Sequence, residues 1–295
     1  MLLKKIGFIG LGSMGFPMAK NLLVEGYQVH ITKHSNNQKS IDRIDALIAL
    51  GAKLESSIVE VVKDVDLIIS VLPADKEVRD VYLNKEVLNA IKTEAIILDM
   101  TSCTAGAIID VEKYYSEKGI RVLDAPVSGG IGGAQKGTLT IFGAGDKNSF
   151  DEIEDVLNCL GDKIYYIGSL GKGKILKSIN NMLNAINTVA VIEGLTVANQ
   201  NGIDLEIMYD VLTNSSGNSN SLEKKFDKIR NNDYEPNFKM SLMKKDVKIA
   251  IDSGKNSNLP IAELVHNMFV NASELGDLDY TSISQIYKNK SSEKS

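Results

Sequence analysis

Three glycines near the N-terminus have the spacing that is typical of dinucleotide binding. The run Gly10-Leu11-Gly12-Ser13-Met14-Gly15 follows an expected strand and precedes an expected helix. In such a unit the first glycine permits a tight turn, the second lets the backbone approach a pyrophosphate, and the third lets the helix pack close to the strand. The helix N-terminus offers free N–H groups to the phosphates. These residues predict a nicotinamide dinucleotide site; the alternative is a glycine-rich turn in an unrelated strand–helix–strand unit.

The end of the second expected strand bears on which dinucleotide is preferred. A chain that binds NAD usually has Asp or Glu there, which accepts a hydrogen bond from the ribose 2′-hydroxyl. Here Ile31 is followed by Thr32-Lys33-His34-Ser35, and no acid occurs before Asp42. Lys33, His34 and Ser35 could instead surround a 2′-phosphate, which a nearby carboxylate would repel. We expect NADP(H) to be favoured over NAD(H); the alternative is that Lys33 and His34 are solvated and the cofactor choice is loose.

A second candidate binding element is the turn Asp124-Ala125-Pro126-Val127-Ser128-Gly129-Gly130. A hydroxyl and consecutive backbone N–H groups in a turn form a concavity that binds anions without a buried cation. Ser128, Gly129 and Gly130 are therefore candidate ligands of a substrate carboxylate. This chemistry favours a small, acid-bearing substrate, and the alternative is an ordinary turn after a strand.

The elements that must position these segments alternate in the first half of the chain. Short apolar runs predict strands, and the amphipathic stretches between them predict helices. Such alternation is typical of right-handed crossover units around a parallel sheet that is covered on both faces. The expected strands are Lys5–Ile9, Gln28–Ile31, Leu67–Val71, Ala95–Asp99, Arg121–Asp124, Leu139–Phe142 and Ile164–Ile167. The expected helices are Met14–Glu25, Lys76–Tyr82, Ala105–Lys118 and Ser149–Leu160.

From Gly171 onward, long helical patterns replace the strand-like runs. The segment Ile175–Asn201 has apolar residues near helical period, and a helix this apolar should be buried between domains or in an oligomer interface. Further helices are expected at Asp204–Leu212, Ser221–Arg230, Phe238–Ser253 and Ala262–Glu274. We therefore predict an α/β Rossmann-type doubly wound domain over residues 1–163. An all-α C-terminal domain for substrate binding and oligomerisation follows over residues 164–295, linked by the long helix that starts near residue 171.

Composition narrows the class of protein. The chain has 295 residues, of which 43% are hydrophobic and 24% charged, a profile typical of a soluble globular protein. Its formal net charge of −5 provides no basic face for nucleic acid. Apolar runs are strand-sized and no signal peptide is recognisable, so no membrane segment is expected. The two cysteines, Cys103 and Cys159, lack metal-ligand spacing, which predicts no metal site and a cytoplasmic location.

Two later segments complete a recognisable pattern. Gly171-Lys172-Gly173-Lys174-Ile175-Leu176-Lys177-Ser178-Ile179-Asn180-Asn181 has the form G-x-G-x-x-x-K-x-x-x-N, and Met243-Lys244-Lys245-Asp246 contains a K-D pair. With the glycine loop and the turn at Asp124–Gly130, these segments resemble the signatures of the β-hydroxyacid dehydrogenase family. That family includes 3-hydroxyisobutyrate dehydrogenase, tartronate semialdehyde reductase and the glyoxylate and succinic semialdehyde reductases. The matches span nearly the whole chain in the family's order.

The resemblance implies roles for the matching residues. Lys177 would be the general acid and base, which a lysine can be when burial lowers its pKa toward neutrality. Asn181 lies four residues later, on the same face of the helix, and would hydrogen-bond the ammonium or the substrate hydroxyl. Asn180 is a further candidate for substrate binding. By the same matches, the other candidate cofactor-binding residues are Leu72, Pro73, Ser102 and Lys245.

The resemblance implies an NAD(P)-dependent oxidoreductase of EC 1.1.1 type that interconverts a small β-hydroxyacid and its semialdehyde. Two departures bear on specificity. Members that prefer NADP usually read Asn-Arg-Thr after the second strand, whereas this chain reads Lys33-His34-Ser35 and lacks a guanidinium there. The lid-like segment Asn214–Ser221 lacks the aromatic or arginine residues of some members, so the distal pocket is polar.

Other functions are weighed against this one. The related imine reductases generally replace the catalytic lysine, so Lys177 argues against them. Phosphogluconate dehydrogenases are longer and have a histidine motif in the catalytic segment that is absent here. A non-catalytic dinucleotide-binding redox sensor would have no need of Lys177 and Asn181 beside a carboxylate-binding turn. The apolar surface of the helix that starts near residue 171 predicts a homodimer or homotetramer.

Overall fold

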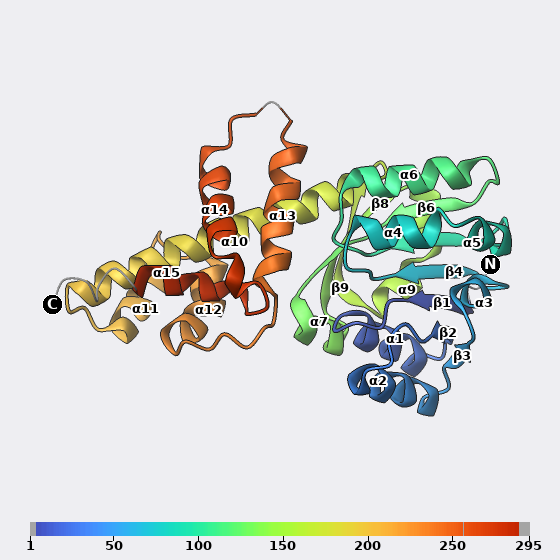
Figure 1. Cartoon of the computed structure of the whole chain (residues 1–295), viewed down its shortest axis with the longest axis horizontal. Helices are drawn as coiled ribbons and strands as arrows, with labels where there is room; N and C mark the ends of the chain where they lie inside the picture. Colours follow the sequence, from blue (N-terminus) through green and yellow to red (C-terminus); the bar gives the residue numbers. More distant parts are fainter. Residues whose placement is uncertain (1–3, 256, 289–295) are drawn as a thin grey trace. The chain divides into compact units, whose positions relative to one another are not determined.

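The structure, a computed structural model, describes residues 4–255 and 257–288 (Figure 1). The chain divides into two compact units, Met1–Lys177 and Ser178–Ser295. The first unit is an α/β unit and the second is helical, which confirms the predicted fold class. Within the described residues, no helix combines the length and the apolar character needed to cross a bilayer.

A mixed sheet forms the centre of the first unit. Its strands are β1 (Lys5–Ile9), β2 (Gln28–Thr32), β3 (Lys53–Glu55), β4 (Leu67–Ser70), β5 (Ile96–Asp99), β6 (Arg121–Asp124), β7 (Val127–Ser128), β8 (Leu139–Gly145) and β9 (Gly161–Gly168). They lie in the order β3-β2-β1-β4-β5-β6-β8-β7, and β9 pairs with β8. Strands β1 to β6 pair in parallel as expected, whereas β8 runs antiparallel to β6 and β7. The strand order reverses between β1 and β4, and ligands of open α/β sheets bind beyond the carboxyl ends of the strands at such a point.

Helices cover both faces of this sheet. They are α1 (Gly15–Val24), α2 (Gln38–Ala49), α3 (Ile58–Val62), α4 (Asp75–Tyr82), α5 (Lys85–Ala90), α6 (Ala105–Ser116), α7 (Gly130–Lys136), α8 (Lys147–Glu152) and α9 (Glu154–Asn158). Figure 1 shows α1 and α2 on one side of the sheet and α4 and α6 on the other. The first three residues of strand β5 are apolar because both faces of the sheet are covered. Leu98 packs in the same cluster as Met18 of α1, whereas Ile97 packs in the cluster of Val111 of α6, because successive side chains point to opposite faces.

The second unit is built on α10 (Lys172–Gln200), which begins in the first unit. The other elements are α11 (Leu205–Thr213), α12 (Asn220–Arg230), α13 (Met240–Ser253), α14 (Pro260–Asn271), η1 (Ser273–Leu275), η2 (Tyr280–Ser284) and α15 (Gln285–Lys288). Asp204 and Ser219 start α11 and α12, because their side chains accept hydrogen bonds from backbone N–H groups of the first turn. Val189, Phe226 and Phe269 belong to its core.

The elements that the sequence did not predict are short or polar. Helix α2 has only Ile44 and Leu47 buried, and its other side chains are polar or face solvent at least in part. The helix expected at Ser149–Leu160 is two helices, α8 and α9, that meet at Ile153. Strand β9 begins at Gly161 rather than at the expected Ile164, and so spans the expected domain boundary after residue 163. The compact units themselves divide between Lys177 and Ser178.

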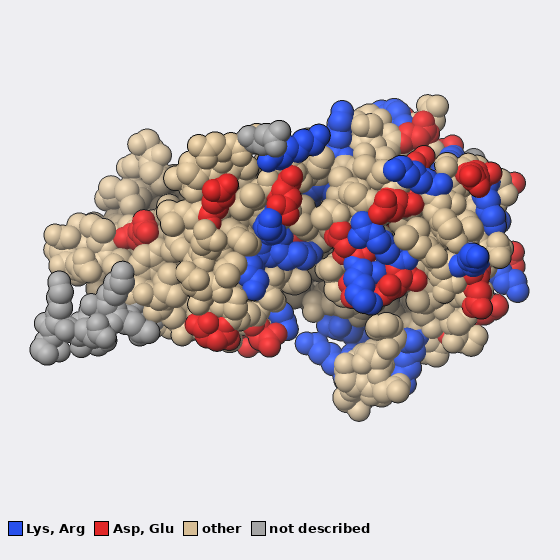
Figure 2. Space-filling model, turned by 45° about the horizontal axis from the view of Figure 1, so that its top comes forward, with Lys and Arg blue, Asp and Glu red and all other residues tan. Residues whose placement is uncertain are grey.

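Charges of both signs are interspersed on the surface. Figure 2 shows Lys and Arg side chains among Asp and Glu side chains on the face that it draws. Several are one turn apart on a helix, as in the Lys76–Asp80 pair of α4 and the Lys248–Asp252 pair of α13. Exposed pairs of this kind add little to stability. The stability of the fold therefore depends mainly on its apolar clusters.

Truncating a buried side chain of strand β5 tests whether the apolar clusters stabilise the fold. We expect Leu98→Ala to lower the free energy of unfolding by about 2–5 kcal/mol, because Leu98 is fully buried and a cavity would remain. Leu50→Ala is the matched control: Leu50 is 43% exposed, and its loss should change stability by no more than about 0.5 kcal/mol. Urea denaturation followed by circular dichroism measures both. Equal effects of the two substitutions would contradict the assignment of the core.

Candidate active site

The glycine loop makes a tight turn between β1 and α1. Gly10 has φ of +100°, and a Cβ there would overlap the carbonyl oxygen of Val71. A Cβ on Gly15 would overlap the carbonyl oxygen of Gly10, whereas a Cβ on Gly12 would have no atom within 4 Å. Met14 precedes α1 without a side-chain cap. The loop thus leaves open space at Gly12 and uncapped N–H groups at the start of α1, which fits a dinucleotide phosphate.

Arg43 of α2 is a residue beside this loop that the sequence did not single out. Its guanidinium donates to the carbonyl oxygen of Leu11 over 3.1 Å and to Ser13 Oγ over 3.5 Å. It also lies 6.0 Å from the centre of the Phe16 ring. Arg43 therefore places a positive charge against the glycine loop, although it lies far from the loop in the sequence.

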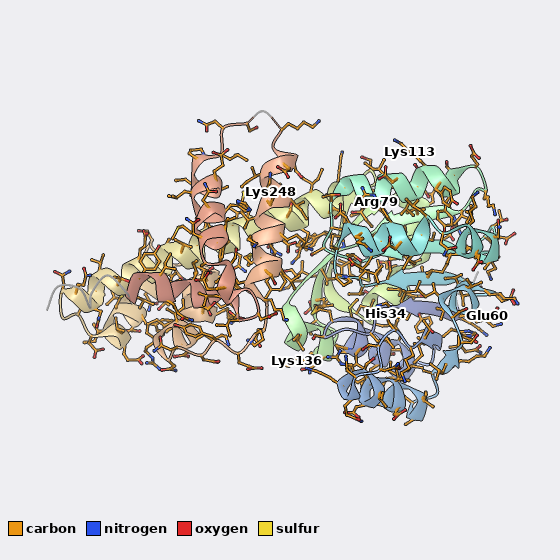
Figure 3. All side chains as sticks on the ribbon, viewed as in Figure 1. His34, Glu60, Arg79, Lys113, Lys136 and Lys248 are labelled. Atoms are coloured by element: carbon orange, nitrogen blue, oxygen red, sulfur yellow. The ribbon has the colours of Figure 1, made fainter. Side chains whose placement is uncertain are left out.

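The residues after β2 have the exposure that contact with a ligand requires. Lys33 and His34, the latter labelled in Figure 3, are exposed. Ser35 Oγ accepts hydrogen bonds from the backbone and side chain of Asn37, the residue that caps α2. A carboxylate that the sequence did not point to lies nearby, since Glu55 of β3 is in register with Thr32.

Glu55 is already paired with two other side chains. Its carboxylate is 2.9 Å from Lys53 Nζ and 2.9 Å from His30 Nδ1. The hydrogen bond from Lys53 lowers the pKa of Glu55 more than partial burial raises it. This carboxylate beside the end of β2 is thus held by local partners.

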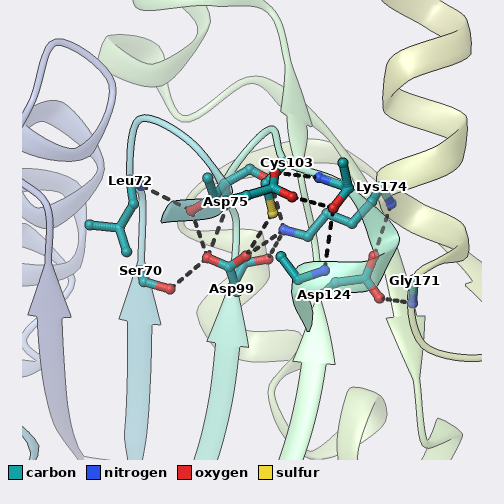
Figure 4. A network of polar contacts seen from close by, with 11 residues as sticks. Ser70, Leu72, Asp75, Asp99, Cys103, Asp124, Gly171 and Lys174 are labelled. Carbon is teal, nitrogen blue, oxygen red and sulfur yellow. Dashed lines mark hydrogen bonds and ion pairs between the residues drawn. The ribbon is translucent and has the colours of Figure 1, made fainter. Parts of the chain in front are cut away.

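A buried polar network lies at the carboxyl ends of β4 and β5 (Figure 4). The Lys174 ammonium lies 2.6 Å from Asp99 Oδ2 and also donates to the carbonyl oxygens of Asp99 and Thr101, over 2.9 and 2.6 Å. Asp99 Oδ1 accepts hydrogen bonds from Ser70 Oγ and Thr101 Oγ1, over 2.7 and 2.6 Å. The side chains of Lys174 and Asp99 are fully buried. One ammonium thus joins α10 to the loop that follows β5.

The charges in this network stabilise each other. Burial alone would raise the pKa of Asp99, but the Lys174 ammonium and the hydroxyl donors outweigh it and hold that pKa below its ordinary value. Burial alone would lower the pKa of Lys174, but the Asp99 carboxylate outweighs it and raises that pKa. Both groups therefore remain charged at neutral pH. A buried pair of this kind requires good hydrogen-bond geometry, because both ions have lost their water.

Asp124, at the end of β6, holds the start of α10. Its carboxylate accepts the backbone N–H groups of Gly171 and Lys174 over 2.6 and 3.0 Å, and so satisfies donors that a helix start leaves free. A Cβ on Gly173 would lie 2.6 Å from Asp124 Oδ2. The second glycine of the G-x-G segment is therefore required by this close approach. Burial raises the pKa of Asp124 to about 6, although Lys174 opposes the shift.

The same network holds two of the candidate cofactor-binding segments. The backbone N–H of Leu72, which precedes Pro73, donates to Thr101 Oγ1 over 2.9 Å. Ser102 directly follows Thr101 and precedes Cys103, whose thiol lies 3.7 Å from Asp99 Oδ2. The sequence contained Asp99 and Lys174 within its motifs but assigned them no role. An acid at the end of each of two neighbouring strands was the signal that could have identified the network.

The turn that contains Ser128 has open backbone on one side. Val127 and Ser128 pair with β8, which fixes the turn at the end of β7. Gly129 and Gly130 have φ of +131° and +63°, values that favour glycine, and a Cβ on Gly130 would have no atom within 4 Å. Gly129 and Gly130 are exposed. Ser128, Gly129 and Gly130 thus lie where β7 ends and α7 begins.

The candidate catalytic face of α10 is buried. Lys177 is 8% exposed, and Asn181, one turn later, is 4% exposed. Asn181 Oδ1 accepts from Asn180 Nδ2 over 3.1 Å, and Asn181 Nδ2 donates to Asp246 Oδ2 over 2.6 Å. Lys245 Nζ lies 3.3 Å from Asp246 Oδ1. Asp246, to which the sequence gave no separate role, therefore joins Asn181 to Lys245 in the second unit.

Comparisons with known proteins identify the family of this chain. A family model described as the NAD binding domain of 6-phosphogluconate dehydrogenase matches residues 5–168. One described as NAD-binding of NADP-dependent 3-hydroxyisobutyrate dehydrogenase matches residues 171–287. The 2-(hydroxymethyl)glutarate dehydrogenase of Eubacterium barkeri is 37% identical over 259 residues, which cover 87% of this chain and 84% of that protein. The chain belongs to the β-hydroxyacid dehydrogenase family.

Two further relatives support the assignment. The 3-hydroxyisobutyrate dehydrogenase of Pseudomonas aeruginosa is 31% identical over 305 residues, covering 97% of this β-hydroxyacid dehydrogenase and 99% of the relative. The structure of 3-hydroxyisobutyrate dehydrogenase from Mycobacterium tuberculosis with L-serine has a TM-score of 0.88 at 28% identity, and covers 97% of this chain and 99% of that one. This chain is therefore an oxidoreductase of hydroxyacids with a nicotinamide dinucleotide as cofactor. Imine reductases, such as that of Myxococcus stipitatus at 18% identity, share the fold alone.

Removing the ammonium of Lys174 tests the network of this β-hydroxyacid dehydrogenase. We expect Lys174→Met to lower the free energy of unfolding by about 3–5 kcal/mol, because Asp99 would be left buried without its partner. Lys172→Met, two residues earlier on α10 and exposed, should change it by less than about 0.5 kcal/mol. Urea denaturation measures both. A Lys174→Met protein as stable as the parent would show that the pair does not hold this part of the fold.

Proposed function

We propose that this β-hydroxyacid dehydrogenase interconverts a small β-hydroxyacid and its semialdehyde, with Lys177 as general acid and base. The observation that carries the proposal is the buried pair Lys177 and Asn181 on successive turns of α10, with Asn181 held by Asp246. A bound nicotinamide dinucleotide supplies the hydride for reduction or accepts it in oxidation. Lys177 donates a proton to the carbonyl oxygen during reduction and takes it from the hydroxyl during oxidation. Asn181 orients the lysine or the hydroxyl.

The carboxylate of the substrate is assigned to the turn at Ser128. The Ser128 hydroxyl and the N–H groups of Gly129 and Gly130 are donors suited to an anion, and Asn180 is a further donor. The names of two relatives state 2-(hydroxymethyl)glutarate and 3-hydroxyisobutyrate, and the M. tuberculosis structure holds L-serine. All three molecules have a CH2OH group on the carbon that carries a carboxylate. We propose that the substrate of the present chain also has a CH2OH group on the carbon that carries its carboxylate.

Substitution of Lys177 tests the role of that residue. Oxidation is measured with 3-hydroxyisobutyrate, 2-(hydroxymethyl)glutarate and L-serine, and reduction with succinic, tartronate and methylmalonate semialdehydes and glyoxylate, by absorbance of NAD(P)H. We expect Lys177→Ala to lower kcat on the best substrate by about 100- to 10,000-fold, because proton transfer is lost. Lys172→Ala, on the exposed side of the same helix, should keep its activity.

Two outcomes would contradict this assignment. Full turnover by Lys177→Ala would exclude the lysine as the proton donor. No turnover of any compound by the parent protein, despite tight cofactor binding, would favour a redox sensor that binds the dinucleotide without catalysis.

For the cofactor, we propose that NADP(H) is favoured over NAD(H). The exposed Lys33 and His34, with Ser35, follow β2, and Arg43 contributes a guanidinium beside the glycine loop. The remaining cofactor contacts are assigned to the backbone at Gly10, Leu11, Gly12, Ser13, Met14 and Gly15 and to Leu72, Pro73, Ser102 and Lys245. The residues that follow β2 in the sequence include positive groups and no carboxylate before Asp42. This charge pattern favours a cofactor that has a phosphate on the ribose.

The ratio of kcat/KM for NADPH and NADH measures this preference. We expect a ratio of about ten or more in favour of NADPH, equivalent to one or two charge-assisted hydrogen bonds. Lys33→Glu should lower kcat/KM for NADPH more than for NADH, because a carboxylate would face the phosphate. Lys20→Glu, an exposed lysine of α1, is the control for added negative charge. A clear preference of the parent protein for NADH would overturn the proposal.

We also propose that the chain forms a homodimer or homotetramer through its second unit. Large apolar side chains are exposed on three of its helices: Leu183 and Val197 of α10, Ile207 and Val211 of α11, and Ile261 and Leu264 of α14. Exposed apolar residues gathered on the helices of one unit are typical of a protein interface.

A further inference from the structure

The ammonium of Lys225, on α12, has no carboxylate partner among the described residues of the second unit. Its side chain is partly buried, and its Nζ lies 5.0 Å from the centre of the Tyr280 ring. Across residues 4–255 and 257–288, this ammonium has no hydrogen-bond acceptor within 3.5 Å and no ion-pair partner within 4.0 Å. Burial lowers the pKa of Lys225, because the charged ammonium loses hydration by water there. An ammonium in this state has unused capacity to bind an anion.

The charge of the Asp279 carboxylate raises the pKa of Lys225, but this carboxylate is not available to bind the ammonium. Asp279 accepts hydrogen bonds from the backbone N–H groups of Asn237, Phe238 and Thr281, over 3.0, 3.1 and 3.2 Å, and from the Thr281 hydroxyl over 2.9 Å. It is fully buried, and its oxygens are occupied by these donors. Asp279 therefore serves the backbone of this segment rather than the lysine.

Asn184 of α10 adds a second unused donor to the same cluster. Its Oδ1 accepts hydrogen bonds from Ser221 Oγ over 3.0 Å and from Tyr280 OH over 3.2 Å. Ser221 lies one turn before Lys225 on α12, and Tyr280 is the residue whose ring Lys225 covers. With its oxygen held by both hydroxyls, the amide presents its NH2 group elsewhere, and that group has no acceptor among the described residues. Among the described residues, the Lys225 ammonium and the Asn184 amide are thus two donors without an acceptor.

This cluster continues the candidate catalytic face of α10. Asn184 lies three residues after Asn181 and seven after Lys177, so the three side chains share one face over two helical turns. Seven residues of helix advance about 10 Å. The lid-like segment that precedes α12 has no cation or aromatic residue from Asn214 to Ser221. Lys225 is the first cation after that segment that is partly buried, since Lys224 before it is exposed.

We propose that Lys225 and Asn184 form a subsite for a second carboxylate, so that the substrate is a hydroxyacid with two acid groups. The inference rests on the proposed function, which assigns the first carboxylate to the turn at Ser128. A carboxylate here would accept a charge-assisted hydrogen bond from Lys225 and a neutral one from the Asn184 amide. It would also give the partly buried ammonium the partner that it lacks.

Two compounds isolate the second carboxylate. 3-Hydroxyisobutyrate and 2-(hydroxymethyl)glutarate share the CH2OH–CH–COO⁻ unit and differ in the remaining substituent, which is a methyl group in the first and CH2CH2COO⁻ in the second. We expect the parent protein to prefer 2-(hydroxymethyl)glutarate in kcat/KM. In Lys225→Met the ratio of the two kcat/KM values should fall by about 10- to 100-fold, mainly through KM, because a charged hydrogen bond is lost.

Matched variants control for indirect effects. Lys224→Met, at the exposed neighbouring position, should leave the ratio unchanged. Lys225→Arg should retain much of the preference, because it keeps the charge. Lys225→Gln provides a second neutral variant if Lys225→Met is poorly folded. A ratio that is the same in the parent and in both neutral variants would overturn the subsite.

A binding measurement separates this inference from the proposed function. Isothermal titration calorimetry with glutarate, and with butyrate as a monocarboxylate control, needs no turnover. We expect Lys225→Met to weaken glutarate binding by about tenfold or more while butyrate binding is weak in both proteins. If neither hydroxyacid is oxidised but glutarate binding depends on Lys225, the proposed function fails and the anion subsite stands. If both are oxidised and glutarate binds equally well without Lys225, the subsite alone fails.

Discussion

The buried ion pair between Lys174 and Asp99 is the interaction on which the candidate active site depends. Two charges removed from water are stable only if their hydrogen bonds are complete, and here Ser70, Thr101 and backbone carbonyls complete them. The requirement leaves little freedom in the loops after β4 and β5 or in the first turn of α10. Leu72, Ser102 and Lys177, three of the residues assigned to the cofactor or to proton transfer, therefore lie on or next to backbone that this ion pair already fixes.

Glycines at two places let the backbone approach closely enough for this arrangement. At Gly173, the helix start must come against Asp124, and at Gly15, the first turn of α1 must come against Gly10. Gly12 differs, because a side chain there would meet no protein atom. Two of these glycines are explained by the protein's own packing, whereas Gly12 has open space beside it.

The sequence predicted the parts of the fold that local pattern determines. Strands such as Lys5–Ile9 and Arg121–Asp124 are continuous apolar or β-branched runs, and their bounds are the same in the structure. Helix α2 was missed because most of its side chains face solvent. The glycine loop lies between a strand and a helix as expected, whereas helix α7, which follows Ser128 and Gly129, was not predicted.

Contacts between distant segments were not predictable in the same way. Lys174 reads as an ordinary residue between motif positions, and only the sheet topology shows that it reaches Asp99, 75 residues away. Arg43 is 32 residues from Leu11, and no periodicity indicates that its guanidinium meets the glycine loop. Lys225 resembles the solvated Lys224 beside it until the positions of Tyr280 and Asn184 are known.

The continuity of α10 has a consequence for how such a protein can change. The two compact units divide between Lys177 and Ser178, within an uninterrupted helix, so the rise from Lys177 to Asn181 is about 6 Å whatever loops surround it. A crossover between genes within this helix would preserve that spacing, provided that the helical register is kept. The lysine with its nucleotide-binding unit and the helices that follow Asn181 can therefore be inherited from different parents. Recombination would in this way exchange the unit that holds Lys225 and Asn184, the residues proposed for the second carboxylate.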